Sequence, residues 1–328
     1  MSHNHELTRL LPASSDETKF LNRFRSYLVS SSIVIIIIFL LVIRYMYGDV
    51  SGGQTPSFVS WEGGAATARR ENDIIRPGSI FSDTRGVPIN AHGGGFLFHG
   101  GTYYWYGEIK SGPTYLPASN AEWGGSRVDL VGISCYASSD LLNWEHRGNV
   151  LPASDDPDDD LYRDNVAERP KVAYNDRTGK FVMWLHVDGA DYARARCGVA
   201  TSDRPEGPFR YVGSFRPNGQ MARDLTVFVD DEFDDDGGGK KAYLLVSSED
   251  NASIHASELT DDYTNTTGNY TRIFVGNFTE APSVFKRRGR YYFIGSGCTA
   301  WRPNPARSAV SSSSILVATT TNGGRNAG

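Results

Sequence analysis

The stretch AERPKVAYNDRTGKFVMWLHVD, residues 167–188, decides the fold class because it has the pattern of a β-hairpin. Apolar and aromatic residues alternate at positions 172 and 174 and again from 181 to 187, on either side of a polar segment at 175–179. A period of two residues is typical of strands, and Asn, Asp and Gly are typical of turns. The first strand begins with Glu168 beside an arginine and a proline. A charge at the entry of a buried strand lies either in solvent, which is its usual place, or at a functional site.

Hairpins of this kind recur along the chain, and they come in pairs. In the first member of each pair, a turn with glycine joins an apolar strand to an aromatic strand. The first members cover residues 93–108, 168–188, 224–250 and 280–297, and the second members cover residues 133–151, 197–215, 254–276 and 314–324. Four pairs of hairpins, each with about four strands, predict the blades of an all-β propeller.

Acidic residues occupy equivalent places in these repeats. Glu168, Asp224 and Glu280 each open the first strand of a pair. Because the innermost strands of a propeller surround one axis, residues at equivalent ends of those strands converge. We therefore expect the three carboxylates to line one shared site. The aspartate runs at 155–164 and 230–239 are interpreted as solvated loops between strands.

The bulk composition limits the classes of partner. The chain has 328 residues and a net charge of −5, which argues against nucleic acid. The three cysteines are Cys135, Cys197 and Cys298, so at most one disulfide can form and one thiol is left over.

An uncharged segment near the N-terminus predicts the topology. Residues 27–43 carry no charge, and with the tyrosines that follow they predict a transmembrane signal anchor over 27–47. The alternative is a cleaved signal peptide, but the preceding segment is long for one. The cations Arg9, Lys19, Arg23 and Arg25 precede the span, so we expect residues 1–26 to be a cytoplasmic tail. Residues 48–70 then form a stem, and residues 71–328 form the propeller domain outside the cytosol.

Glycosylation motifs agree with this orientation. Four Asn-X-Ser/Thr motifs follow the span, at Asn251, Asn265, Asn269 and Asn277. They predict a glycoprotein of the secretory pathway, in the Golgi, a vacuole or endosome, or at the cell surface.

The expected chemistry follows from converging carboxylates. A glycosidase needs one carboxylic acid to protonate the leaving oxygen, and an inverting one also needs a base that activates water on the opposite face of the sugar. Aromatic residues in YWYGE (104–108) and CTAW (298–301) can supply faces on which sugars stack, although aromatic residues on strands are mostly core.

The motifs resemble glycoside hydrolase family 43, and most closely its subfamily 24, the exo-β-1,3-galactanases. They are, in chain order, AHGGGFLFHGGTYYWYGE, VAERPKVAYN, ARDLTVFVDD, SSEDN and TEAPSVFKRRGRYYFIGSGCTAWRPNPAR. The resemblance runs from about residue 73 to 310. It implies a five-bladed propeller and an inverting exo-hydrolase that acts on β-1,3-linked galactan of arabinogalactan type. It implies no cofactor, and it leaves a structural calcium ion open.

The resemblance also assigns residue roles. It implies that Glu280 is the general acid and that Glu168 orients sugar hydroxyls and tunes the pKa of Glu280. The remaining substrate contacts that we predict are His92, Glu108, Tyr192, Asp224, Asn251 and Thr299. For Glu108 and Asp224 the alternative is a structural ion pair. A contact of Asn251 with substrate would make its motif a poor glycosylation site.

Two departures from the family pattern affect the expected activity. The place of the family's usual Asp base reads AHGGG, with Ala91 and His92. The galactanase subfamily instead uses a Gln on the fifth blade, and the low-complexity stretch SAVSSSSILVATTTNGGRNAG (308–328) does not match that blade. We therefore expect about four blades, a C-terminally truncated domain and little hydrolysis by the 328 residues alone. The competing interpretations are a non-catalytic glycan-binding or vestigial propeller, and an arabinofuranosidase or xylosidase of the same family.

Overall fold

The computed structural model describes residues 74–115, 127–230, 240–299, 304–311 and 315, which all belong to the unit Ala66–Gly328. Within these residues the regular structure is β-strand, apart from one short 3₁₀ helix, η1 (Pro217–Gly219). The all-β prediction is therefore confirmed.

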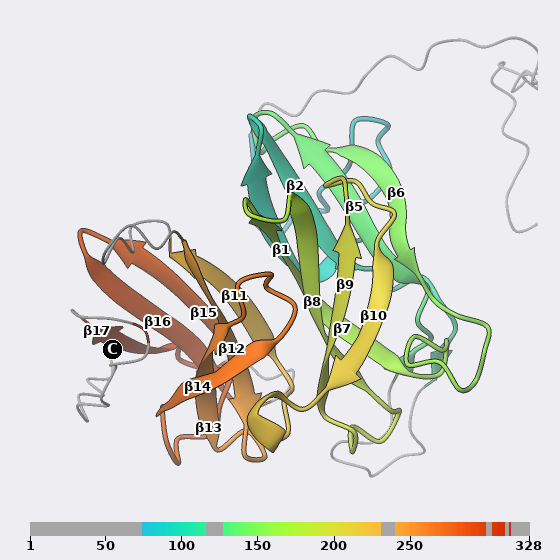
Figure 1. Cartoon of the computed structure of the whole chain (residues 1–328). Helices are drawn as coiled ribbons and strands as arrows, with labels where there is room; N and C mark the ends of the chain where they lie inside the picture. The colour runs from blue at the N-terminus through green and yellow to red at the C-terminus, as the bar shows by residue number, and fades with distance from the viewer. Residues whose placement is uncertain (1–73, 116–126, 231–239, 300–303, 312–314, 316–328) are drawn as a thin grey trace, which may run out of the picture. The chain divides into compact units, whose positions relative to one another are not determined.

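Four antiparallel sheets form the blades of a propeller (Figure 1). Blade 1 contains β1 (His92–His99), β2 (Thr102–Glu108), β5 (Gly132–Ser138) and β6 (Glu145–Pro152). Blade 2 contains β7 (Val166–Asn175), β8 (Lys180–Asp188), β9 (Arg196–Ser202) and β10 (Arg210–Phe215). Blade 3 contains β11 (Leu225–Asp230), β12 (Lys241–Ser248), β13 (Ser253–Leu259) and β14 (Thr266–Ile273). Blade 4 contains β15 (Thr279–Arg287), β16 (Arg290–Gly297) and β17 (Arg307–Ser311), and β3 (Thr114–Tyr115) pairs with β4 (Arg127–Val128) beside blade 1.

The first strands of the blades are neighbours in space. Strand β7 contacts both β1 and β11, and β11 contacts β15. These are the strands that the repeat pattern predicts to surround the axis, so segments far apart in the sequence begin side by side. Of the fourth predicted pair, residues 314–324 lie outside the described residues except for Ile315, which is buried against blades 3 and 4.

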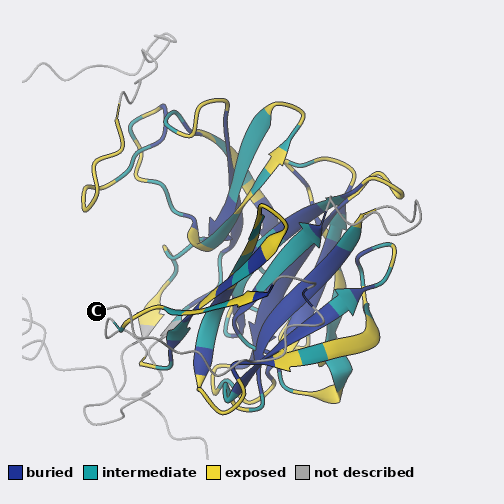
Figure 2. Cartoon of the chain, turned by 90° about the vertical axis from the view of Figure 1, so that its left-hand side faces the viewer, coloured by how far each residue is buried: buried dark blue, intermediate teal, exposed yellow. Residues whose placement is uncertain are grey.

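Three apolar layers hold the blades together. The alternation in β8 shows how they form: Met183 and Leu185 pack in a layer with blade 1, whereas Val182 and Trp184 pack in a layer with blade 3. A strand buried on both faces reads as a nearly continuous apolar run, which is what the sequence of β8 shows. The third layer joins blades 3 and 4 through residues such as Tyr243 and Phe293. Figure 2 shows this burial along the central strands.

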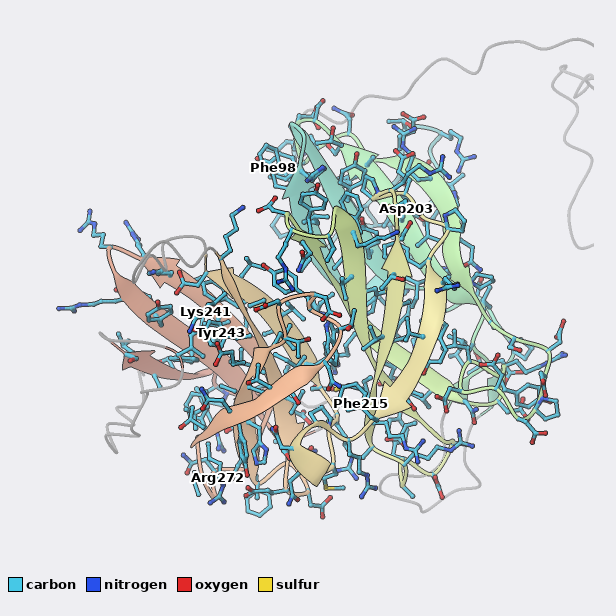
Figure 3. The ribbon with its side chains drawn as sticks, viewed as in Figure 1. Phe98, Asp203, Phe215, Lys241, Tyr243 and Arg272 are labelled. Atoms are coloured by element: carbon cyan, nitrogen blue, oxygen red, sulfur yellow. The ribbon has the colours of Figure 1, made fainter. Side chains whose placement is uncertain are left out.

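Blades 1 and 4 each expose one apolar face. In blade 4, Phe285, Tyr292 and Val310 are register partners on adjacent strands, and Phe285 and Val310 are 43% and 54% exposed. In blade 1, Phe96 and Phe98 of β1 are 61% and 60% exposed (Phe98 is labelled in Figure 3). Apolar area of this kind is uncommon on a fully packed sheet, so these faces differ from those of blades 2 and 3.

Two further predictions concern the N-terminus and the cysteines. The predicted anchor at 27–47 and the stem at 48–70 lie outside the described residues, and no helix among the residues described is long and apolar enough to cross a membrane. The three cysteines, Cys135, Cys197 and Cys298, are free thiols, so the one disulfide that their number allows does not form.

Candidate active site

Glu168 enters the site through a bulge in β7. The β7–β8 register shifts between Glu168 and Lys171, and Arg169 has a φ of 59°, in the left-handed region. Such a bulge re-aims the side chain that precedes it. The Arg169 backbone N–H donates to Oε1 of Glu108 at 3.1 Å, which ties blade 2 to blade 1. The Glu-Arg-Pro sequence at the strand entry therefore builds the backbone of a site.

Glu280 enters through a bulge of the same kind in β15. The β15–β16 register shifts between Glu280 and Ser283, and Ala281 has a φ of 50°. The Ala281 backbone N–H donates to Oδ2 of Asp224 at 3.0 Å. In both bulges, the residue after the glutamate thus binds an acid from the preceding blade, and a proline follows it.

Blade 1 has a related break in β1, where the register shifts between His92 and Gly95. Gly93 has a φ of 56°, and a Cβ atom there would lie 2.6 Å from Oε1 of Glu108, so the position needs glycine. The Lys171 ammonium donates to the carbonyl oxygens of Gly93 and Arg169 at 3.1 and 3.3 Å. It therefore clamps the bulges of blades 1 and 2 together.

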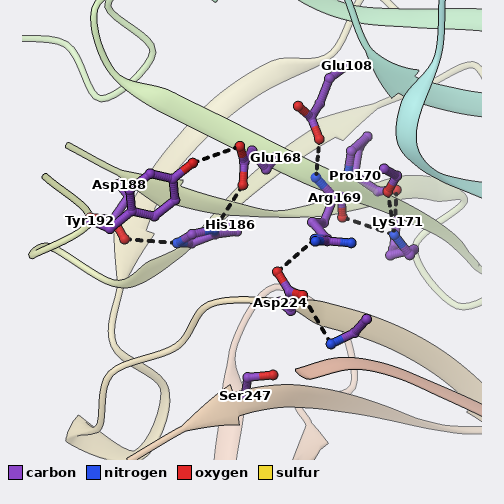
Figure 4. Close-up of polar contacts among 12 residues, drawn as sticks. Glu108, Glu168, Arg169, Pro170, Lys171, His186, Asp188, Tyr192, Asp224 and Ser247 are labelled. Carbon is purple, nitrogen blue, oxygen red and sulfur yellow. Dashed lines mark hydrogen bonds and ion pairs between the residues drawn. The ribbon is translucent and has the colours of Figure 1, made fainter. Parts of the chain in front are cut away.

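Figure 4 shows the polar groups around Glu168. The Tyr192 hydroxyl donates to Oε1 at 3.0 Å, and the Lys110 ammonium lies 3.6 Å from the same oxygen. Nδ1 of His186 lies 3.7 Å from Oε2. Burial by itself would raise the pKa of Glu168, but the positive charges of His186 and Lys110 and the hydrogen bond from Tyr192 lower this pKa to about 2. Glu168 is therefore a carboxylate at neutral pH.

Glu280 has the opposite electrostatic surroundings. Burial raises its pKa, and the negative charge of Asp224 raises it further, while Arg169 and the nearby Cys298 thiol oppose the shift. A raised pKa keeps a carboxylic acid protonated closer to neutral pH, which is what a proton donor requires. The site thus holds one glutamate that favours the charged form and one that favours the neutral form.

Asp224 and Glu108 lie beside these glutamates and carry ion pairs. Asp224 precedes β11 and accepts from Arg169 Nε at 2.7 Å, and Glu108 ends β2 with Oε2 at 2.5 Å from Lys110 Nζ. Burial and the charge of Glu168 raise the pKa of Glu108, against the effect of Lys110. Asp224 binds both Arg169, which follows Glu168, and the backbone N–H of Ala281, which follows Glu280, and the ion pairs considered as an alternative are present. A sugar contact by Glu108 or Asp224 stays a prediction.

Three other residues were predicted as substrate contacts: His92, Asn251 and Thr299. His92 opens β1 as the register partner of Glu108, and its side chain is exposed. Asn251 lies beside Cys298, which in turn lies beside Glu280. Thr299 is exposed, and its Oγ1 accepts from Asn304 Nδ2 at 2.6 Å. The roles predicted for these residues therefore stay predictions.

Five contributors were not predicted as site residues: Lys110, Arg169, His186, Asp188 and Cys298. Arg169 and Cys298 stood in quoted motifs, but nothing in the sequence gives the left-handed backbone of the one or the acid contact of the other. A signal for His186 and Asp188 was present, because two polar residues alternate in the otherwise apolar strand FVMWLHVD (181–188). Among the described residues, no group of three or more His, Cys, Asp or Glu side chains could hold a metal ion.

Comparisons with known proteins identify the family. Residues 99–322 match Glycosyl hydrolases family 43. A family 43 β-1,3-galactosidase solved with galactodeoxynojirimycin is 41% identical over 73% of this chain and 77% of that one, with a TM-score of 0.63. Two exo-β-1,3-galactanases are also similar: that of Phanerochaete chrysosporium, solved with galactose, is 37% identical, with a TM-score of 0.61, and that of Clostridium thermocellum is 43% identical, with a TM-score of 0.59.

These two alignments each cover 72% of this chain but only 50% and 48% of the galactanase chains, so the chain spans about half the length of those relatives. No match was found among curated proteins. The family match covers more than half of the chain, and the three similar structures are 37–43% identical to it. The chain therefore belongs to glycosyl hydrolase family 43 and is a glycosyl hydrolase by family.

Proposed function

We propose that the protein is an inverting exo-β-1,3-galactanase in which Glu280 is the general acid. The observation that carries this proposal is the pair of matched bulges, which present two glutamates with opposite pKa shifts to one site. The printed names of its relatives, exo-β-1,3-galactanase and β-1,3-galactosidase, support β-1,3-linked galactan as the substrate. The same site in a non-catalytic propeller would need no proton donor.

In this reaction Glu280 gives its proton to the glycosidic oxygen while the bond from that oxygen to C1 of the terminal galactose breaks. Positive charge then develops on the sugar ring, and water attacks C1 from the opposite face. Glu168 stays ionised and orients the sugar hydroxyls, and the negative charge of Asp224 helps keep the pKa of Glu280 high. Tyr192 and His186 hold the Glu168 carboxylate in place from the side of blade 2.

The base of this reaction has no counterpart among the described residues. The chain contains two glutamines, Gln54 and Gln220, and Gln220 follows η1, where its backbone N–H donates to the carbonyl of Pro217. General-base assistance typically contributes about 10²–10⁴-fold to a rate. We therefore expect the 328 residues alone to release little galactose from galactan.

The exposed apolar faces of blades 1 and 4 also bear on the base that the described residues lack. Phe96 and Phe98 on one blade and Phe285 and Val310 on the other are apolar surface of the kind that another blade covers. A fifth blade, as the family resemblance implies, would bury both faces and bring a base. The absence of a base among the described residues favours one second candidate, a glycan-binding propeller without catalysis.

One assay separates the two candidates. The full chain is incubated with β-1,3-galactan, with and without sodium azide, and products are followed by proton NMR. Azide can attack C1 in place of activated water, so a site that lacks only its base should form α-galactosyl azide, with Glu280 still protonating the leaving oxygen. Galactose or its azide as the only small product supports an exo-galactanase. Binding of galacto-oligosaccharides without either product would support the non-catalytic candidate, and release of arabinose or xylose from aryl glycosides would point to the other activities of the family.

We also propose that the protein is a type II membrane glycoprotein of the secretory pathway. The uncharged run at 27–43 within the predicted anchor, and the tail cations before it, support this orientation. Asn265, Asn269 and Asn277 have exposed side chains, whereas that of Asn251 is only half-exposed and lies beside Cys298. Protease treatment of intact microsomes tests the proposal: the propeller should be protected, and endoglycosidase should remove glycans from the exposed asparagines but none from Asn251. Digestion of the propeller without detergent would contradict the orientation.

A further inference from the structure

His186 is a buried histidine between two carboxylates. It lies on β8, directly across from Glu168 in the β7–β8 register. Its Nε2 is 2.9 Å from Oδ2 of Asp188, and its Nδ1 is 3.7 Å from Oε2 of Glu168. The side chains of His186 and Asp188 are 1% and 0% exposed. Glu168, His186 and Asp188 thus form a row in which the histidine lies between the two carboxylates. A buried charge is stable only when it is paired, so each member of this row depends on its neighbours.

Asp188 has a second set of contacts that ends at the same glutamate. Its Oδ1 accepts from the backbone N–H groups of Gly189 and Arg194 at 3.0 and 2.8 Å. These bonds fix the loop that follows β8, and this loop carries Tyr192, whose hydroxyl donates to Glu168 at 3.0 Å. Both oxygens of Glu168 are thus held by groups that Asp188 orients: Oε2 through His186, and Oε1 through the loop.

We propose that His186 and Asp188 are positioning residues that fix Glu168 as an oriented carboxylate, with Asp188 as the anchor of both arms. This inference rests on the proposed function, because Glu168 serves there as the ionised partner of the acid. Neither residue is placed to touch the sugar. Their effect is transmitted through the carboxylate of Glu168.

The charges facing this row come from three elements. Lys110, after β2, lies 3.6 Å from Glu168, and it also neutralises Glu108. Arg169 of β7 pairs with Asp224, before β11, and so contributes little free positive charge. Although burial alone would lower it, the two carboxylates raise the pKa of His186 to about 9. The imidazolium therefore persists at neutral pH and keeps Glu168 ionised.

Two substitutions test the row with little change of shape. Asp188→Asn retains an oxygen for the loop N–H groups but removes the negative charge. His186→Gln retains a donor near Glu168 but removes the positive charge. The matched control is His99→Gln, since His99 lies at the other end of β1, tilted against Tyr174 and edge-on to Phe181.

The first readout does not require activity. Nitrogen-15 NMR of the full chain should show both ring nitrogens of His186 protonated at pH 7, with His186→Gln used for assignment. In Asp188→Asn the pKa of His186 should fall by about 1–3 units, because a buried neighbouring charge is lost. A neutral His186 in the unsubstituted chain, or the same titration in Asp188→Asn, would overturn the proposal.

The second readout is the pH profile of galactose release or of the azide reaction. Glu168 must be ionised, so the acid limb should move up by about 1–3 pH units in both variants. The rate at the optimum should fall on the order of 10–100-fold through misplacement of the carboxylate, with less change in KM. A loss of rate with an unmoved acid limb would show a merely structural role and refute the proposal. If the unsubstituted chain gives no product even with azide, the proposed function fails. The NMR result alone then tests whether His186 and Asp188 hold Glu168 as a carboxylate.

Discussion

Glu168 in blade 2 and Glu280 in blade 4 are presented by the same backbone device. Each precedes a residue in the left-handed region and then a proline, and each bulge donates a backbone N–H to an acid of the preceding blade. Their surroundings differ. Glu168 faces His186, Lys110 and a tyrosine hydroxyl, whereas Glu280 faces the carboxylate of Asp224. The repeated bulge therefore sets the position of the two carboxyl groups, and the neighbouring side chains set their protonation.

The largest effect is expected when the acid itself is removed. In the azide reaction on β-1,3-galactan, Glu280→Gln should lower the rate by about 10²–10⁴-fold, because glutamine cannot give a proton to the leaving oxygen. An aryl galactoside, whose leaving group needs little protonation, should lose much less rate. Glu168→Gln should slow both substrates, since it removes a contact to the sugar and a partner of the acid. Equal losses on the two substrates for Glu280→Gln would show that Glu280 is a binding residue.

A smaller change should follow when the neighbour of the acid is neutralised. Asp224→Asn keeps an oxygen for the Ala281 N–H but removes the charge that raises the pKa of Glu280. Activity requires protonated Glu280 and is lost as pH rises through its pKa, so the alkaline limb of the rate profile should move to lower pH. Asp230→Asn, at the other end of β11, is the matched control and should leave this limb in place. An alkaline limb that stays put in Asp224→Asn would mean that burial alone governs Glu280.

The smallest effect concerns the bulge itself. Ala281 has a φ of 50°, which costs a residue with a side chain about 1 kcal/mol. Ala281→Gly should therefore change the free energy of unfolding by less than about 1 kcal/mol, because the relief of strain offsets the added freedom of the unfolded chain. Ser283→Gly, in the regular part of β15, should cost about 0.5–1 kcal/mol. Chemical denaturation compares the two, and an equal cost at both positions would contradict the strained bulge.

Much of the fold could be predicted because propeller strands alternate in pattern and are separated by turns. The repeats at 93–108 and 168–188 match strand pairs to within a few residues, and the equivalence of Glu168 and Glu280 follows from them. The left-handed backbone at Arg169 and Ala281 could not be predicted, since neither residue type favours it.

The neighbours of the glutamates were harder to predict than the glutamates. His186 lies across the hairpin from Glu168. This pairing depends on the register between β7 and β8, which shifts at the bulge between Glu168 and Lys171. Lys110 reaches Glu168 from another blade, so only the folded chain brings the two together, whereas Cys298 follows β16 in the same blade as Glu280. Residue roles in the site thus depend on contacts between blades, which the pattern within one blade does not contain.

The most direct test of the account is a titration of the two carboxyl groups in the same molecule. The full chain is labelled with carbon-13 at the glutamate side-chain carboxyls, and the Glu168→Gln and Glu280→Gln variants assign the two signals. Glu168 should titrate near pH 2, well below the ordinary glutamate value of 4.5, and Glu280 should titrate above that value. Equal pKa values for the two groups, or a higher pKa for Glu168 than for Glu280, would contradict this prediction.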